Sequence, residues 1–146
     1  AGIDALTALA TQRITSVELR SIKNPAAFAG VEYISKRKIR LNAITRDTVL
    51  FSGSALDAVK HFPQNINVAG ILSLAGIGAS KTKITIVASP KVKNNIHEIE
   101  IVSPAATVFT RTSNVVHPEN PKTSYLAVLS AAGVLRKVFA PIKIGT

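Results

Sequence analysis

The sequence predicts a single α+β domain, in which helices pack on one face of a mixed or antiparallel sheet. The expected strands and helices come in groups along the chain, and no strand–helix–strand repeat is visible. The 146 residues suffice for one compact domain, and 47% of them are hydrophobic, which is enough to build a buried core. Because no linker, internal repeat or low-complexity tract divides the chain, we expect residues 1–146 to form one domain.

In the first half of the chain we expect two helices and two strands. Apolar residues at helical spacing indicate the first helix, and Ser54 can cap the first turn of the second. Alternating apolar and β-branched residues indicate the strands. The expected helices cover Gly2–Gln12 and Ala55–His61, the strands cover Thr15–Ile22 and Thr48–Ser52, and Val31–Asn42 is expected to be mostly loop.

The second half is expected to contain two helices with three strands between them. Pro63 suits the first turn of a helix and Gly78 suits its C-terminal end. The last helix is hydrophobic around most of its circumference, which predicts burial on more than one side. The helices are expected at Pro63–Gly78 and about Lys122–Phe139, and the strands at Thr82–Ala88, Asn95–Val102 and Ala105–Thr112, the last two as an antiparallel hairpin.

The composition excludes several classes of protein and site. There is no Cys, which rules out disulfides, Cys-ligated zinc, iron–sulfur clusters and thiolate catalysis. The longest apolar stretches, Val68–Ile77 and Tyr125–Val134, are too short to cross a bilayer, and no signal-peptide pattern is visible. We therefore expect no membrane partner and a cytoplasmic location.

The net charge of +10 favours anionic partners. The densest basic cluster is Lys36–Arg40, preceded by Arg20 and Lys23. One interpretation is a nucleic-acid or phosphate patch, and the other is a solvated basic edge. We favour the second, and expect no nucleic-acid partner, because Tyr33 is the only aromatic residue near the cluster and nucleic-acid binders usually interleave aromatic residues.

Familiar catalytic and phosphate-binding motifs are missing or out of context. The glycines of Gly76–Thr82 resemble part of a dinucleotide or phosphate loop, but they close a helix and lead into a strand, whereas both motifs need the reverse order. We interpret them as a helix end. The three histidines, His61, His97 and His117, lack the spacing of metal ligands, so no metal site is expected. No nucleophile elbow of the Gly-x-Ser-x-Gly type occurs.

His97 stands out among the histidines as a candidate functional residue. In a strand it would share a face with Ile99 and Ile101, so one interpretation is a core histidine with its hydrogen bonds satisfied. The other is a general acid–base residue, since an imidazole titrates near neutral pH.

Two polar segments at helix starts allow both a structural and a functional interpretation. The amides in Pro63–Asn67 could cap a helix or bind a planar ligand. The segment Glu119–Ser124, with Lys122, could begin a well-capped buried helix or hold a carboxylate or phosphate at the helix N-terminus.

Four segments in series resemble the C-terminal catalytic domain of L-aspartate dehydrogenases. The resemblance implies a fold similar to that of the C-terminal domain of dihydrodipicolinate reductase. The first residues, Ala1–Ala5, look like the end of that family's Gly-Ala-Ile-x-Gly-x-Asp-Ala segment. The resemblance runs in order over the whole chain. The four segments are Phe62–Ala69, Asn95–Ile99, Glu119–Ser124 and Lys143–Thr146.

The resemblance implies an NAD- or NADP-dependent oxidation of L-aspartate to iminoaspartate, which feeds quinolinate synthesis and so NAD biosynthesis. It implies that a Rossmann cofactor domain precedes this region, so we expect no turnover by residues 1–146 alone. By the same resemblance, His97 matches the active-site histidine, Asn67 matches a cofactor-contacting asparagine, and Ala1 lies near a cofactor-contacting alanine. A homodimer through the sheet and a quinolinate-forming enzyme are the expected protein partners.

The chemistry of aspartate oxidation is consistent with these positions. His97 could accept the amine proton or donate to a substrate carboxylate, and Asn67 could fix the nicotinamide carboxamide. We expect Lys122 with Thr123 and Ser124 to supply donors for the substrate carboxylates. The alternatives are another Rossmann-linked reductase, of the dihydrodipicolinate reductase or homoserine dehydrogenase type, and a basic module that binds phosphate or nucleic acid.

Overall fold

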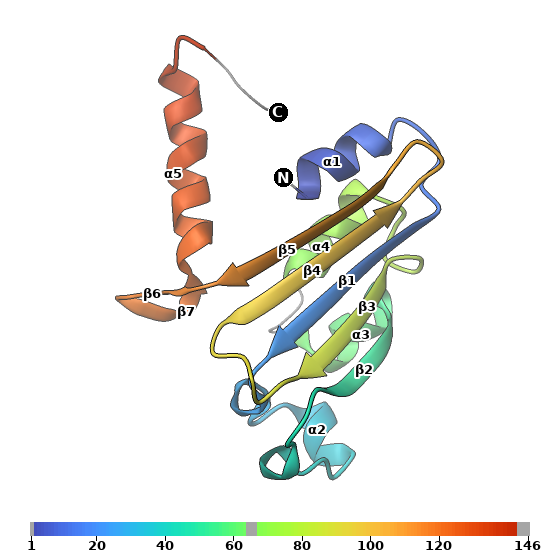
Figure 1. Ribbon diagram of the computed structural model, residues 1–146, viewed down its shortest axis with the longest axis vertical. Helices are drawn as coiled ribbons and strands as arrows, with labels where there is room; N and C mark the ends of the chain where they lie inside the picture. The colour runs from blue at the N-terminus through green and yellow to red at the C-terminus, as the bar shows by residue number, and fades with distance from the viewer. Residues whose placement is uncertain (1, 64–66, 143–146) are drawn as a thin grey trace.

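A five-stranded mixed sheet organises the chain, and the computed structural model describes residues 2–63 and 67–142 of it. The strands lie in the order β2-β3-β1-β4-β5; β1 runs parallel to β3, and every other neighbouring pair is antiparallel (Figure 1). This confirms the predicted fold class, including the hairpin of β4 and β5. The strands are β1 Ser16–Lys23, β2 Thr48–Ser54, β3 Lys83–Ala88, β4 Asn95–Val102 and β5 Thr107–Asn114.

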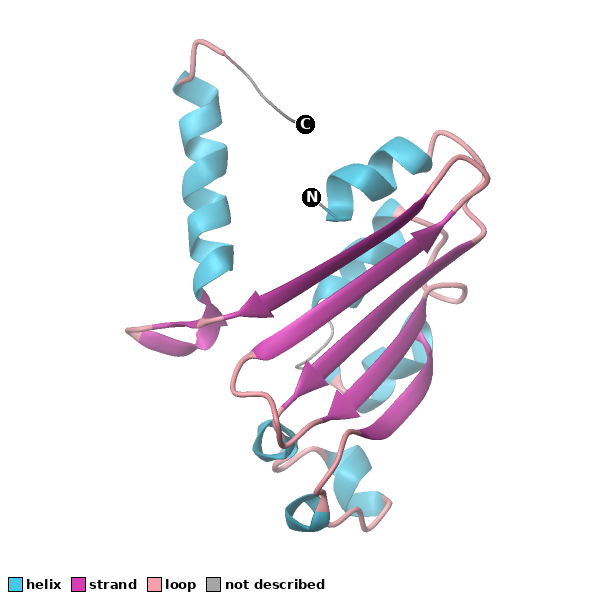
Figure 2. Cartoon of the chain, in the orientation of Figure 1, coloured by secondary structure: helices cyan, strands magenta, loops and turns pink. Residues whose placement is uncertain are grey.

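Helices cover one face of this sheet and leave the other face open. Helices α1 (Gly2–Leu9), α3 (Ala55–His61) and α4 (Asn67–Ala75) all lie behind the sheet in the orientation of Figures 1 and 2. The main core fills the space between these helices and the sheet. Its largest fully buried side chains include Phe28, Phe62, Leu6, Leu72, Leu19, Ile84 and Ile101.

The alternation of β1 and β4 determines what each face of the sheet carries. Ser21 pairs with His97, and Leu19 pairs with Ile99, so these side chains face the helices together. The residues between them point to the open face, where Arg20 pairs with Glu98. His97 therefore lies on the core side of the sheet, beside isoleucines, as the sequence pattern predicts.

Helix α3 has the bounds that the sequence predicts, and Ser54 caps its beginning. The Ser54 Oγ accepts a hydrogen bond from the Asp57 amide at 3.1 Å and donates one to the Asp57 carboxylate at 2.6 Å. These bonds satisfy a backbone donor of the first turn and fix the Asp57 side chain there.

The glycines after α4 form a helix end and not a phosphate loop, as predicted. Gly78 has φ +86°, a conformation that favours glycine, and its amide donates to the Ser73 carbonyl at 3.0 Å. Gly76 lies against α1, since a Cβ there would be 3.3 Å from the Leu6 side chain and 2.9 Å from the Leu72 carbonyl oxygen. The small residues of this segment therefore allow α1 and α4 to pack closely.

Several predicted boundaries were wrong. The region predicted as loop contains a short helix, α2 (Glu32–Lys36), because Tyr33 and Ile34 bury against the core. Helix α4 is described from Asn67 onwards, and residues 64–66 of the predicted helix lie outside the described residues. The last helix begins at Tyr125 and not at about Lys122, because the residues before it fold into a small hairpin of β6 (Val116–His117) and β7 (Asn120–Ser124).

The last helix, α5 (Tyr125–Phe139), was predicted to be buried on more than one side, and this was wrong for the chain by itself. It follows the β6–β7 hairpin and extends away from the sheet (Figure 1), and none of its residues is buried. Leu135 and Phe139 are 65% and 85% exposed. The apolar character of α5 therefore has no covering surface among the residues that the structure describes.

Candidate functional site

A cavity of about 390 Å³ opens where the beginning of β4 and the end of β5 meet the beginnings of α4 and α5. Its lining combines apolar side chains with hydroxyl, amide and imidazole groups, a mixture typical of small-molecule sites. His97 and Asn95 come from β4, and Thr112 and Asn114 come from β5. The other lining residues are Val68, Ile99, Ser124, Leu126, Ala127 and Ser130.

His97 is held half-buried in this cavity by its place on an inner strand. Its Nδ1 lies 3.4 Å from the side-chain nitrogen of Asn114. Burial lowers the pKa of His97 below the ordinary value of 6.5, and the positive charge of Lys23 lowers this pKa further. The imidazole is therefore neutral at neutral pH, which lets it accept or donate a proton without first losing one.

Asn114 links His97 to the beginning of α5. The Ser124 hydroxyl donates to the Asn114 side-chain oxygen at 3.3 Å, while the amide nitrogen of the same Asn114 side chain faces His97. The hairpin that contains Ser124 is also tied to the segment after β5, since the Tyr125 amide donates to the Val115 carbonyl at 2.9 Å. The cavity wall and the histidine are thus joined by side-chain contacts.

Strand β1 contributes two polar groups next to His97. Ser21 pairs directly with His97 and is 3% exposed, and its hydroxyl has no hydrogen-bond partner among the described residues. Lys23, two residues further on the same face, has its pKa lowered by burial. A cation and a buried hydroxyl on this side make the region favourable for an anionic group.

The structure brings some of the predicted site residues together and leaves others undescribed. Ser124 lines the cavity with His97. Asn67 is the first residue of α4 as described and is exposed; its neighbour Val68 lines the cavity, and Asn67 itself is not among the lining residues. Ala1 falls outside the described residues.

The reasoning that placed Lys122 and Thr123 at a helix N-terminus was wrong. Both residues belong to strand β7, because the helix begins only at Tyr125. Their side chains lie outside the described part of the chain, so their binding roles stay predictions.

The sequence analysis missed Asn114, Asn95 and Thr112 as site residues. The register of the hairpin pairs His97 with Thr112 and Asn95 with Asn114, so β5 carries polar groups along the whole His97 side of the cavity. The predicted strand Ala105–Thr112 was displaced by two residues from β5, which runs from Thr107 to Asn114, so the pairing could not be read from it and Asn114 lay outside it. Thr110, Thr112 and Asn114 occupy every second position after Val108, and this pattern could have indicated a strand with polar groups on one face that continues to Asn114.

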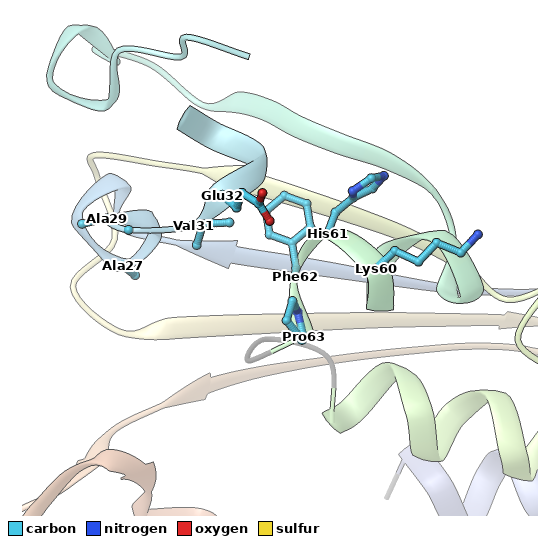
Figure 3. A pocket seen from close by; sticks show the side chains of 9 residues that line it. Ala27, Ala29, Val31, Glu32, Lys60, His61, Phe62 and Pro63 are labelled. Atoms are coloured by element: carbon cyan, nitrogen blue, oxygen red, sulfur yellow. The ribbon is translucent and has the colours of Figure 1, made fainter. Parts of the chain in front are cut away.

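A second cavity, of about 350 Å³, lies between residues 27–32 and 60–63 (Figure 3). Its charged groups are already paired, since Lys60 bonds Asp57 at 3.0 Å and Glu32 bonds Lys36 at 2.8 Å. His61 instead packs its ring 4.8 Å from the ring of Tyr33. This cavity therefore offers less chemistry than the cavity at His97.

The described residues contain no cluster of three or more His, Cys, Asp or Glu side chains that could hold a metal ion. Over the same residues, no helix has both the length and the apolar character needed to span a bilayer.

Comparison with known proteins identifies the family. The family described as aspartate dehydrogenase, C-terminal, matches residues 4–138. The chain belongs to the aspartate dehydrogenase C-terminal family. This confirms the resemblance noted in the sequence, and the chain spans about half the length of the relatives that it matches.

Two relatives and one crystal structure show the extent of the similarity to other members of the aspartate dehydrogenase family. The chain is 44% identical to L-aspartate dehydrogenase of Methanosarcina barkeri over 100% of its length, and 48% identical to that of Methanococcoides burtonii over 99%; each alignment covers 54% of the relative. The crystal structure of aspartate dehydrogenase from Thermotoga maritima superposes with a TM-score of 0.77 at 30% identity, covering 99% of this chain and 52% of that one.

Proposed function

We propose that this chain is the substrate-binding part of an NAD- or NADP-dependent dehydrogenase that oxidises L-aspartate to iminoaspartate. The observation that carries the proposal is the His97 cavity, which combines a neutral imidazole, amides and hydroxyls with a neighbouring cation in a member of the aspartate dehydrogenase C-terminal family. The cofactor-binding Rossmann domain is proposed to lie in the other half of the protein.

Asn67 and Ala1 are the residues proposed to contact a nicotinamide cofactor. Asn67 is exposed at the beginning of α4, and its amide has both the donor and the acceptor that a carboxamide needs. Ala1 is the second residue proposed to contact the cofactor. When bound, the nicotinamide supplies the ring that accepts the Cα hydrogen of aspartate with its electron pair.

The chain's own residues are proposed to bind, orient and shield the substrate. His97 contacts the reacting end of aspartate from β4, and the apolar residues Ile99, Leu126 and Val68 exclude water from the reacting atoms. Ser124 lies on the cavity wall, where its backbone amide is proposed to donate to a substrate carboxylate together with Lys122 and the Thr123 amide, which precede it in β7.

The proposed partners follow from the product and from the open face of the sheet. Iminoaspartate is a reactive imine, so a quinolinate-forming enzyme in the cytoplasm is its proposed consumer, in the service of NAD biosynthesis. The open sheet face carries Phe109, which is 60% exposed, among charged residues of both signs. We propose that two copies pair through this face as a homodimer.

The experiment is a comparison of substrates with the full protein that contains this chain. Formation of NADH or NADPH should occur with L-aspartate and should exceed the rate with the substrates of related Rossmann-linked reductases. If a folded, cofactor-loaded protein turns over homoserine or a dihydrodipicolinate-type substrate instead, the proposed reaction is wrong. Retention on an immobilised nucleic acid that weakens steeply with salt would favour the basic-module alternative.

A further inference from the structure

Ser124 stands at the N-cap of α5, but its side chain caps nothing. A serine at this position normally accepts a hydrogen bond from the first turn, and here no side-chain cap bond forms. The Ser124 hydroxyl instead donates to the side-chain oxygen of Asn114 at 3.3 Å. The first turn of α5 therefore lacks a stabilising side-chain cap, and the Ser124 hydroxyl bonds the Asn114 amide group that faces His97.

In the structure the Asn114 side chain lies between Ser124 and His97 and uses a different end for each. Its oxygen accepts from the Ser124 hydroxyl, and its NH₂ group, which can only donate, faces His97 Nδ1 at 3.4 Å. Nδ1 must then offer a lone pair. Because a neutral imidazole carries one N–H, the proton of His97 lies on Nε2.

We propose that Asn114, held by Ser124, is a positioning residue that keeps the proton of neutral His97 on Nε2 and so makes His97 a hydrogen-bond donor to a substrate carboxylate. This inference rests on the proposed function. It selects between two roles of the histidine, because an Nε2 that carries a proton cannot also accept the proton of the substrate amine.

The surroundings of Nε2 suit an anion. Nδ1 is the only ring nitrogen of His97 with a hydrogen-bond partner among the described residues, so Nε2 is available to a ligand in the cavity. Among the groups that the structure describes, Lys23 from β1 is the one charge that acts on His97 there. The described side chains that β5, α4, β7 and α5 contribute to this cavity do not titrate: they are Thr112, Asn114, Val68, Ser124, Leu126, Ala127 and Ser130.

The first test reads the tautomer directly and does not depend on activity. In the full protein labelled with ¹⁵N-histidine, the ring shifts of His97 should show the proton on Nε2 at neutral pH. Asn114→Asp replaces the donor by a carboxylate, so the proton should move to Nδ1 and the pKa of His97 should rise. Ser124→Ala, which frees the amide to rotate, should give a mixture of tautomers. A wild-type proton on Nδ1, or shifts that Asn114→Asp leaves unchanged, would overturn the proposal.

The second test separates a donor from a base. The side-chain nitrogen of Gln can occupy the place of Nε2–H but cannot take up a proton, so His97→Gln should keep at least about ten times the kcat of His97→Ala. Asn114→Asp should lower kcat on the order of a hundredfold and move the pH midpoint of turnover upwards. Equal loss in His97→Gln and His97→Ala would contradict the donor role.

A matched control accompanies these variants. Ser113→Ala lies on the same strand but on the opposite face of the sheet, so its kcat and pH profile should equal those of the wild type. If wild-type protein shows the Nε2 tautomer but no aspartate oxidation, the proposed function fails while the assignment of the tautomer stands.

Discussion

His97 is neutral at neutral pH because of the strand positions around it. An imidazole on an exposed loop would be protonated in part at neutral pH, whereas burial between β1 and β5 keeps this one neutral. Lys23, on the same face of β1, adds a cation that opposes protonation. Two strands therefore determine the protonation state of a residue on a third.

This arrangement predicts a pH effect. Lys23→Gln removes the neighbouring charge, so the pKa of His97 should rise but stay below 6.5, since burial, the larger cause, remains. The ring-proton shifts of His97, followed by NMR across the acid range, measure this directly. A pKa that falls or does not move in Lys23→Gln would show that the charge does not act on His97.

The same shift affects stability. Because the pKa of His97 is lower in the folded chain than in the unfolded one, the unfolded chain binds more protons between the two values. The contribution of His97 to stability is therefore complete above the unfolded pKa and is lost as the pH falls through the folded value.

The identity of the key residue could be predicted from the sequence, but its neighbours could not. The alternation of Asn95–Val102 places His97 among isoleucines, and the structure confirms this. Asn114 and Thr112 approach His97 only through the hairpin register, which depends on where β5 ends. Cross-strand pairing is a tertiary property, so a two-residue error in one boundary was enough to hide it.

Among the helices, those with local signals were predicted well. Ser54 and Asp57 define the beginning of α3 by their own hydrogen bonds, so its bounds agree with the prediction. Helix α2 has no side-chain cap and forms because Tyr33 and Ile34 are buried in the core. No local sequence pattern therefore predicted it. Helix α5 was predicted from its composition, but composition does not say where a covering surface lies.

Two glycines near each other give a sharp test of the close packing at the end of α4. Gly76→Ala should destabilise the chain by about 1–3 kcal/mol, because the new Cβ would meet the Leu72 backbone oxygen of α4 at 2.9 Å and the Leu6 side chain of α1 at 3.3 Å. Gly70→Ala, inside α4, meets nothing within 4 Å and should stabilise by about 0.5–1 kcal/mol. Urea unfolding of both variants gives the comparison. Equal effects from both would mean that the close contacts at Gly76 do not exist as described.

Considered as a whole, the described part of the chain leaves exposed apolar side chains uncovered on two surfaces. One is the open sheet face around Phe109, and the other is the length of α5. On the sheet face, Glu98 lies between Arg20 and Arg111, at 3.8 and 3.2 Å. A surface that carries both signs of charge around an aromatic residue can pair with its own copy across a two-fold axis.

The proposed dimer can be tested with one variant on each surface. Phe109→Asp places a charge on the open face at the edge strand β5 and should shift the protein towards monomer in sedimentation experiments. Leu135→Asp, on α5, should leave the dimer intact. The reverse pattern would place the dimer interface on α5, and a wild-type monomer would rule out the homodimer altogether.

The most direct measurement is the rate of NADH or NADPH formation from L-aspartate by the full protein, compared with its His97→Ala variant. If the His97 cavity is the site of aspartate oxidation, the wild type turns over aspartate and the variant loses at least about a hundredfold in kcat while its unfolding midpoint shows that it is folded. A folded variant with near-normal turnover would contradict the assignment of this cavity.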